Sequence, residues 1–255
     1  MTAVSRPLTQ ALSVRPTSYF GMSRAPRYSI LFALPLLVAY EALAAMLARP
    51  GQGELRNGAD AMLRSAFTAV AGPRGSTYFM AAVILLGIVL VIRDRRRTDA
   101  FKPMVFVGML AESTALALAF GFVISLTTAK LLGSLHALSI GQIETMPWNT
   151  RLMLSLGAGL YEELFFRVLL VTGLAAGARV VLGFGQRAAV ILAVLVGAVI
   201  FSAFHYIGPY GDPWELQSFT FRMLSGLAFS GLYVLRGFGI TAWTHALYDA
   251  FLLLL

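Results

Sequence analysis

The chain contains no cysteine, and few of its residues are charged. The lack of cysteine excludes disulfides, thiolate metal sites and cysteine nucleophiles. Only 13% of the 255 residues are charged and 58% are hydrophobic, whereas a soluble domain is nearer a quarter charged and half apolar. With a mean hydropathy of +0.76, this composition predicts a polytopic membrane protein.

The net charge is +8, but the basic residues are not arranged as in a nucleic-acid-binding protein. They are mostly arginines clustered between apolar runs, as at 93–97, and aromatic residues are not interleaved with them as in a single-strand binding groove. Such clusters are typical of the cytoplasmic loops of membrane proteins. We therefore expect the chain to lie in a lipid bilayer and to bind no nucleic acid.

Seven apolar runs are close to the roughly 20 residues that a helix needs to cross the hydrocarbon core. They cover residues 28–48, 76–92, 104–128, 152–174, 188–207, 219–235 and 238–255. A further segment, 59–72, has apolar residues at helical spacing and could lie in the interface or re-enter the membrane. The predicted fold is an all-α, polytopic transmembrane bundle of about seven or eight helices.

The N-terminal residues differ in composition from the rest of the chain. Residues 1–27 contain four arginines and no acidic residue, with scattered Ser, Thr and Pro. We expect them to form a flexible cytoplasmic tail, followed by a single transmembrane helical domain over 28–255. No linker or soluble domain is visible in the sequence.

The distribution of arginine predicts the orientation of the bundle. The tail, the run at 93–97 and the loop that carries Arg179 and Arg187 are expected on the cytoplasmic side. The loop 206–217 has two acidic residues and no basic residue, so it is expected outside. The Arg- and Ala-rich composition and the lack of organelle signals favour a bacterial plasma membrane (the inner membrane) as the location of this multi-pass protein.

Several ionisable residues lie inside the apolar runs, where a mid-bilayer charge costs about 2.5–3.5 kcal/mol on insertion scales. Such residues are retained because they pair with another group or because they act chemically. They are Glu41, Glu112, Glu162, Glu163, Asp249, His205 and His245. In the first half of the chain Glu41 and Glu112 each stand alone, whereas the others gather in the second half.

The segment GLYEELFFRVLLV, residues 159–171, places two adjacent glutamates and an arginine in an apolar helix. Glu163 and Arg167 are four positions apart, so they share a helix face and can form an ion pair. Glu162 is turned about 100° away and has no basic partner at helical spacing. Both glutamates could be structural, but Arg167 accounts for the charge of Glu163 only, which makes Glu162 the better candidate for chemistry.

Two further apolar segments carry histidines. His205 ends a span that is rich in small residues, which allow another helix to approach closely, and a lone histidine there is more often interfacial than catalytic. His245 and Asp249 are four positions apart; they could satisfy each other, or the carboxylate could orient the imidazole. Three polar motifs on three helices predict an active site buried among the C-terminal helices.

These three motifs resemble those of the CPBP family of intramembrane proteases, also called the CAAX protease and bacteriocin-processing or Abi family. The family pattern is Glu-Glu-x-x-x-Arg, Phe-x-x-x-His and His-x-x-x-Asn/Asp. In this chain it reads EELFFR (162–167), FSAFH (201–205) and HALYD (245–249), in the same order. The resemblance covers about residues 150–255, and Asp249 stands where many members carry Asn.

The resemblance implies a glutamic intramembrane endopeptidase that hydrolyses a peptide bond within or beside the bilayer. The implied site residues are Glu162, His205, Glu163, Arg167, His245 and Asp249. Glu162 and His205 correspond to the residues that activate the attacking water. His245 and Asp249 would help to hold that water or to stabilise the tetrahedral oxyanion.

Members of this family process prenylated proteins in eukaryotes. In bacteria they are linked to peptide maturation, to bacteriocin self-protection and to the sorting of surface proteins with C-terminal anchors. The implied partner is therefore a membrane protein or peptide, with a C-terminal anchor or a lipid as candidate features.

Two alternatives stay open. Two histidines with one or two carboxylates are adequate zinc ligands, but His-Glu-x-x-His is absent and no two histidines share a helix. We therefore expect no cofactor, with zinc as the alternative.

A non-enzymatic transporter or a binding protein of the bacteriocin-immunity type would also bury a polar cluster. Transporters tend to have duplicated halves, whereas the polar motifs here have no counterpart in the first half of the chain.

Overall fold

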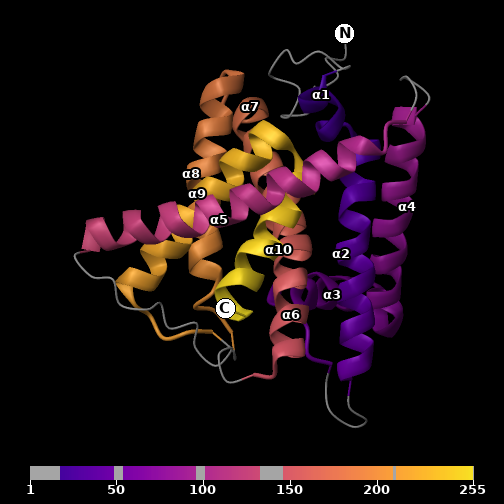
Figure 1. Cartoon of the computed structure of the whole chain (residues 1–255), viewed down its shortest axis with the longest axis horizontal. Helices are drawn as coiled ribbons and strands as arrows, with labels where there is room; N and C mark the ends of the chain where they lie inside the picture. The colour runs from indigo at the N-terminus through magenta and orange to yellow at the C-terminus, as the bar shows by residue number, and fades with distance from the viewer. Residues whose placement is uncertain (1–17, 49–53, 96–100, 133–145, 209–210, 255) are drawn as a thin grey trace.

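The computed structural model describes residues 18–48, 54–95, 101–132, 146–208 and 211–254, and every regular element in these ranges is a helix (Figure 1). The α-helices are α1 (Tyr19–Arg24), α2 (Pro26–Leu47), α3 (Gly58–Ala71), α4 (Gly75–Arg95), α5 (Met104–Leu132), α6 (Trp148–Gly157), α7 (Thr172–Val180), α8 (Gln186–Phe204), α9 (Leu216–Arg236) and α10 (Phe238–Leu254). A short 3-10 helix, η2 (Gly72–Arg74), joins α3 to α4, and a π-helix, η4 (Ala158–Val171), lies between α6 and α7. The predicted all-α fold is confirmed.

Five segments of the described chain are long and apolar enough to cross a membrane, namely 26–47, 58–94, 104–132, 186–204 and 216–236. The two other predicted spans are also helical, since 152–174 lies within α6, η4 and α7, and 238–254 forms α10. The span predicted at 188–207 ends at Phe204, because residues 205–208 form turns and Gly208 adopts a positive φ of 92°. The apolar segment 59–72 lies mainly in α3.

The chain from α6 to α7 is one continuous helix, because both junction residues, Ala158 and Thr172, have right-handed helical backbone angles. The π-helix η4 forms the middle segment of this helix and carries the Glu-Glu-x-x-x-Arg motif. In keeping with the wider turn, the Thr172 hydroxyl donates to the carbonyl oxygen of Arg167, five residues earlier. π-helical turns are rare and are frequently found at functional sites.

Small residues let the helices around η4 approach it closely. A Cβ atom on Gly159 would lie 2.6 Å from the Cβ of Ala246 and would also meet the backbone of Ala242 on α10. A Cβ on Gly197 of α8 would lie 2.7 Å from Cγ2 of Val171. Close packing at these glycines therefore brings the three motif-bearing helices together.

Part of the predicted flexible tail, residues 1–17, lies outside the described residues. The rest contains α1, which packs on α9 through Arg236, whose guanidinium donates to Ser23 Oγ at 2.9 Å. Arg236 also pairs with Glu112, with NH2 and Oε2 2.7 Å apart, and the Tyr19 hydroxyl donates to the same carboxylate at 2.6 Å. Burial and this hydrogen bond raise the pKa of the Tyr19 phenol above its usual range. The prediction that Glu112 stands alone is therefore wrong.

The two ends of the bundle carry different segments. Figure 1 shows α1 and α7 at one end, and the end of α10 and the start of α6 at the other. An ion pair between Arg27 and Asp94, 3.8 Å apart, joins the beginning of α2 to the end of α4. Which end faces the cytoplasm stays a prediction from the arginine distribution.

Candidate active site

Glu162 is held by a residue far away in the sequence. Its Oε1 accepts a hydrogen bond from Nδ2 of Asn57 at 2.8 Å, and only 8% of Glu162 is exposed. Asn57 is the N-cap of α3, and its Oδ1 accepts from the backbone N–H of Ala59 at 2.9 Å. Asn57 was not among the predicted site residues, although an Asn directly before an apolar helical segment is a typical start signal for a helix.

The neighbouring carboxylate of Glu163 points to a different helix. Its Oε1 lies 2.7 Å from Nδ1 of His245, and its Oε2 lies 3.2 Å from Nε of Arg167. Glu163 is fully buried. The predicted ion pair between Glu163 and Arg167 is confirmed. Because an ionised carboxylate only accepts hydrogen bonds, Nδ1 of His245 is the donor.

Arg167 is fully buried, and aromatic rings surround its charge. The guanidinium carbon lies 4.4 Å from the ring centroid of Phe201, 5.8 Å from that of Phe229 and 6.0 Å from that of Phe166. Among the described residues, NH1 and NH2 of Arg167 have no hydrogen-bond partner. The cation therefore depends on Glu163 and on the faces of these rings for its stabilisation.

Glu163, and not Asp249, orients the imidazole of His245. Nε2 of His245 is 3.6 Å from Oδ2 of Asp249, which is too long for a hydrogen bond. The ring also stacks on Phe229, with centroids 4.4 Å apart and an interplanar angle of 18°. The idea that His245 and Asp249 satisfy each other by a hydrogen bond is therefore wrong in this structure.

His205 is the C-cap residue of α8, and its Nδ1 lies 2.9 Å from the carbonyl oxygen of Phe201. A carbonyl oxygen only accepts, so Nδ1 carries the proton and the neutral ring has its lone pair on Nε2. The Phe201 ring lies between the two histidines, with its centroid 5.0 Å from that of His205 and 6.4 Å from that of His245. The structure thus brings the three motifs together around Glu162.

The segment after α8 folds back over His205. The backbone N–H of Asp212 donates to the carbonyl oxygen of His205 at 2.9 Å. Three aromatic rings cluster in this segment and at the start of α9: the centroid of Trp214 lies 5.1 Å from that of Tyr206 and 4.8 Å from that of Phe219. The loop 206–217, which its charges led us to expect on the outside, therefore contacts His205.

A second polar cluster lies beside the site. Arg64 and Arg56 both pair with Glu41, at 2.7 and 3.0 Å, and both also pair with Asp60, at 2.6 and 3.1 Å. The hydroxyl of Tyr161, next to Glu162 in the chain, donates to Glu41 at 2.9 Å. The prediction that Glu41 stands alone is therefore wrong, since its ion-pair partners come from the segment after α2 and its hydrogen-bond donor Tyr161 comes from η4.

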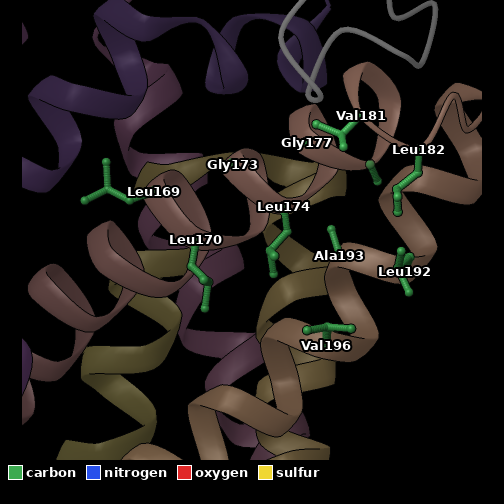
Figure 2. Close-up of a pocket in the computed structure, with 11 residues that line it drawn as sticks. Leu169, Leu170, Gly173, Leu174, Gly177, Val181, Leu182, Leu192, Ala193 and Val196 are labelled. Carbon is green, nitrogen blue, oxygen red and sulfur yellow. The ribbon is translucent and has the colours of Figure 1, made fainter.

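A pocket of about 550 Å³ lies away from these groups, between α8 and the end of η4 with α7 (Figure 2). Its walls are aliphatic or glycine, formed by Leu169, Leu170, Gly173, Leu174, Gly177, Ala178, Val181, Leu182, Leu192, Ala193 and Val196. No predicted site residue lines it. An apolar hollow without a polar group can accommodate hydrocarbon but offers nothing for hydrolysis.

The described residues also bear on the zinc alternative. Within the described ranges, no group of three or more His, Cys, Asp or Glu side chains is placed so that it could hold a metal ion. In addition, Nδ1 of both His205 and His245 lies within hydrogen-bond distance of a protein acceptor, so only Nε2 of each ring could coordinate a metal ion. Metal independence stays a prediction that chelation can test.

Comparison with known proteins identifies the C-terminal part of the chain. Residues 144–251 match the family model of the type II CAAX prenyl endopeptidase Rce1-like proteins. This segment is similar to the proteins of that family. It contains all six predicted site residues, so the resemblance inferred from the motifs is confirmed.

The Rce1-like match begins just before α6, and the chain that forms α1 to α5 lies outside it. No curated protein and no solved structure matches the chain. The match supports an intramembrane endopeptidase in general terms. Together with the five apolar helices it identifies a multi-pass membrane protein.

Proposed function

We propose that this protein is an intramembrane endopeptidase in which Glu162 and His205 activate a water molecule for attack on a peptide bond. The observation that carries the proposal is the convergence of Glu162, His205 and His245 from three helices on one buried site. The Rce1-like match over these helices supports the reaction class.

Glu162 suits the role of general base. Asn57 occupies its Oε1, so Oε2 is the oxygen that can accept the proton of the attacking water. A carboxylate in a site with little water keeps its electrostatic interactions strong, because the surrounding dielectric is low.

His205 can hold the same water and later move its proton. Its Nδ1 donates to the backbone, so Nε2 of the neutral ring can accept a hydrogen bond. As the water oxygen bonds to the carbonyl carbon, its proton passes to Glu162. When the carbon–nitrogen bond breaks, Glu162 returns this proton to the leaving amine, directly or through Nε2 of His205, and both side chains end in their starting states.

His245 is the candidate donor for the oxyanion of the tetrahedral intermediate. Its Nδ1 donates to Glu163, so Nε2 can donate to an oxyanion only when the ring is the imidazolium. A neutral ring could donate to the oxyanion only with its proton on Nε2 in place of Nδ1. In the proposal, the Glu163 carboxylate keeps the ring in position and stabilises its positive charge, and Arg167 holds that carboxylate in place.

The proposed substrate is a membrane-associated protein or peptide, and the proposed location is the inner membrane of a bacterium. A terminal-peptide mass spectrometry comparison of membrane fractions tests both proposals, using cells with the wild-type protein, Glu162→Gln or Glu54→Gln. Glu54 has a side chain that is 61% exposed, so Glu54→Gln is the matched control. New peptide termini should depend on the wild-type protein, persist in Glu54→Gln cells and disappear in Glu162→Gln cells.

Glu162→Gln should leave the fold intact, because a glutamine oxygen can still accept the hydrogen bond from Asn57. The cleavage rate should fall by about 100- to 10,000-fold, the usual contribution of a general base. Normal processing by a well-folded Glu162→Gln protein would contradict the role of Glu162. Peptide termini that are the same with and without the wild-type protein would favour the transporter or binding-protein alternative.

A further inference from the structure

The hydrogen bond to Glu162 comes from a part of the chain that the Rce1-like match does not cover. Asn57 precedes α3, and 105 positions separate it from Glu162. Both residues are buried, with 7% of Asn57 and 8% of Glu162 exposed. A buried amide that donates to a buried carboxylate at 2.8 Å is a specific contact, because neither group has bulk water as an alternative partner.

We propose that Asn57 is a positioning residue for Glu162: its amide fixes one carboxylate oxygen and leaves the other free to act as the base. The inference rests on the proposed function, because it concerns the same carboxylate. It adds that the helices outside the Rce1-like match supply part of the catalytic apparatus.

The Asn57 amide can present only its Nδ2 to Glu162. Its Oδ1 already accepts the backbone N–H of Ala59 as the N-cap of α3, and this bond sets which end of the amide is the donor. The backbone N–H of Asn57 donates to the Tyr40 hydroxyl at 3.1 Å. Gly157 allows the close approach, since a Cβ there would lie 2.8 Å from Cβ of Asn57 and 2.5 Å from Cε2 of Tyr40.

Asn57 is in turn anchored to the second polar cluster. The Tyr40 hydroxyl donates to Asp60 Oδ2 at 2.8 Å, and Asp60 is fully buried. Asp60 holds Arg56 and Arg64, and both arginines pair with Glu41. A chain of hydrogen bonds and ion pairs thus connects Glu162 to α2 and α3, which gives this buried cluster a role beyond stability.

The donor matters because it stabilises the ionised form of the carboxylate. Among the charged or titratable groups around Glu162 are His205 on α8, His245 and Asp249 on α10, and Glu163 and Arg167 on η4 itself. None of these is hydrogen-bonded to Glu162 among the described residues. Loss of the Asn57 donor should therefore favour protonation of Glu162 and weaken it as a base.

Two variants separate this role from helix capping. Asn57→Ser keeps a good N-cap for α3 but is too short to reach Glu162, and Asn57→Asp keeps the cap but places a second carboxylate against it. Thr68→Ala is the matched control, because Thr68 is an exposed residue of α3 whose hydroxyl bonds only to the Arg64 backbone among the described residues. Thermal unfolding in detergent checks that each variant is folded.

The first measurement is infrared difference spectroscopy of the purified full-length protein over a pH titration. Loss of a band in Glu162→Gln assigns the Glu162 carboxyl group. In Asn57→Ser the midpoint of the pH titration of this band should move up by about one pH unit or more. A shift of that size corresponds to the loss of one hydrogen bond to a charged group. Asn57→Asp should move the midpoint further, and Thr68→Ala should leave it unchanged.

The second measurement is the pH profile of cleavage of a farnesylated, quenched-fluorescence CAAX peptide in liposomes. In Asn57→Ser, kcat should fall about 10- to 100-fold with little change in KM, and the acidic limb should move to higher pH. If Asn57→Ser does not fold, Asn57→Asp supplies both readouts.

An unmoved midpoint of the Glu162 band in folded Asn57 variants would overturn the positioning role, whatever the activity. Equal cleavage rates for the wild-type protein and a folded Asn57→Ser variant would also overturn the positioning role. Normal cleavage by Glu162→Gln, in contrast, would overturn the proposed function. The spectroscopic shift does not depend on the peptide chosen, so the two failures are distinguishable.

Discussion

Nδ1 of His245 lies 2.7 Å from Oε1 of Glu163, so a buried carboxylate on η4 holds the imidazole on α10. The second oxygen of that carboxylate lies 3.2 Å from Arg167. Glu163 therefore connects two of the three sequence motifs through one side chain. Asp249, which follows His245 by four positions, has no hydrogen bond to the ring at its distance of 3.6 Å.

This arrangement predicts different effects for two carboxylate-to-amide substitutions. Glu163→Gln should lower the free energy of unfolding by about 3–5 kcal/mol, because it leaves the Arg167 charge buried without its counter-ion. It should also lower activity, since the remaining amide oxygen can accept from His245 but carries no negative charge to stabilise its imidazolium. Asp249→Asn should be much milder in both respects. Thermal unfolding in detergent and the rate of peptide cleavage measure the two effects, and equal losses in both variants would contradict the assigned geometry.

Parts of this site could be predicted from the sequence, because the necessary information was local. The pairing of Glu163 with Arg167 follows from a separation of four positions, and the motifs stand out as polar groups in apolar runs. The contacts that were missed join residues distant in the sequence, such as Asn57 with Glu162 or Glu112 with Arg236. Such pairs depend on which helices pack together, and helical periodicity carries no information about that.

The π-helix also could not be predicted. An α-helical rotation of about 100° separates neighbouring side chains, and on that basis Glu162 and Glu163 were expected to diverge. They do diverge, toward Asn57 and His245, but within a wider helix that close packing at Gly159 holds against α10. Nothing in the local sequence distinguishes this π-helix from an ordinary apolar α-helix.

The close approach at Gly159 gives the second prediction. Gly159→Ala would place a Cβ 2.6 Å from Cβ of Ala246, so η4 and α10 would have to separate. We expect the free energy of unfolding to fall by about 1–3 kcal/mol, which is typical of overpacking. The cleavage rate should also fall, because Glu163 would move away from His245. Gly173→Ala is the control, since nothing lies within 4 Å of a Cβ there, and its effect on stability should stay within about 0.5 kcal/mol.

The third prediction concerns metal. Purified protein should keep its activity after exhaustive chelation with EDTA and should contain far less than one zinc ion per chain. Elemental analysis and peptide cleavage before and after chelation measure this. Loss of activity that zinc restores would instead make Glu162, His205 and His245 ligands, with Nε2 as the coordinating atom of each ring.

The last prediction concerns the side of the membrane on which the site opens. The segment after α8 contacts His205, and the arginine distribution predicts that this segment faces the outside. The native chain has no cysteine, so a single introduced cysteine is the only thiol that a maleimide can label in this protein. Trp214 is 62% exposed in this segment, and Val181 is 79% exposed in the turn between α7 and α8, next to the predicted cytoplasmic end. In intact cells a membrane-impermeant maleimide should label Trp214→Cys and should leave Val181→Cys unlabelled until the membrane is broken. The reverse pattern would place the mouth of the site in the cytoplasm, and a protease with that orientation would take its substrates from the inner face of the membrane.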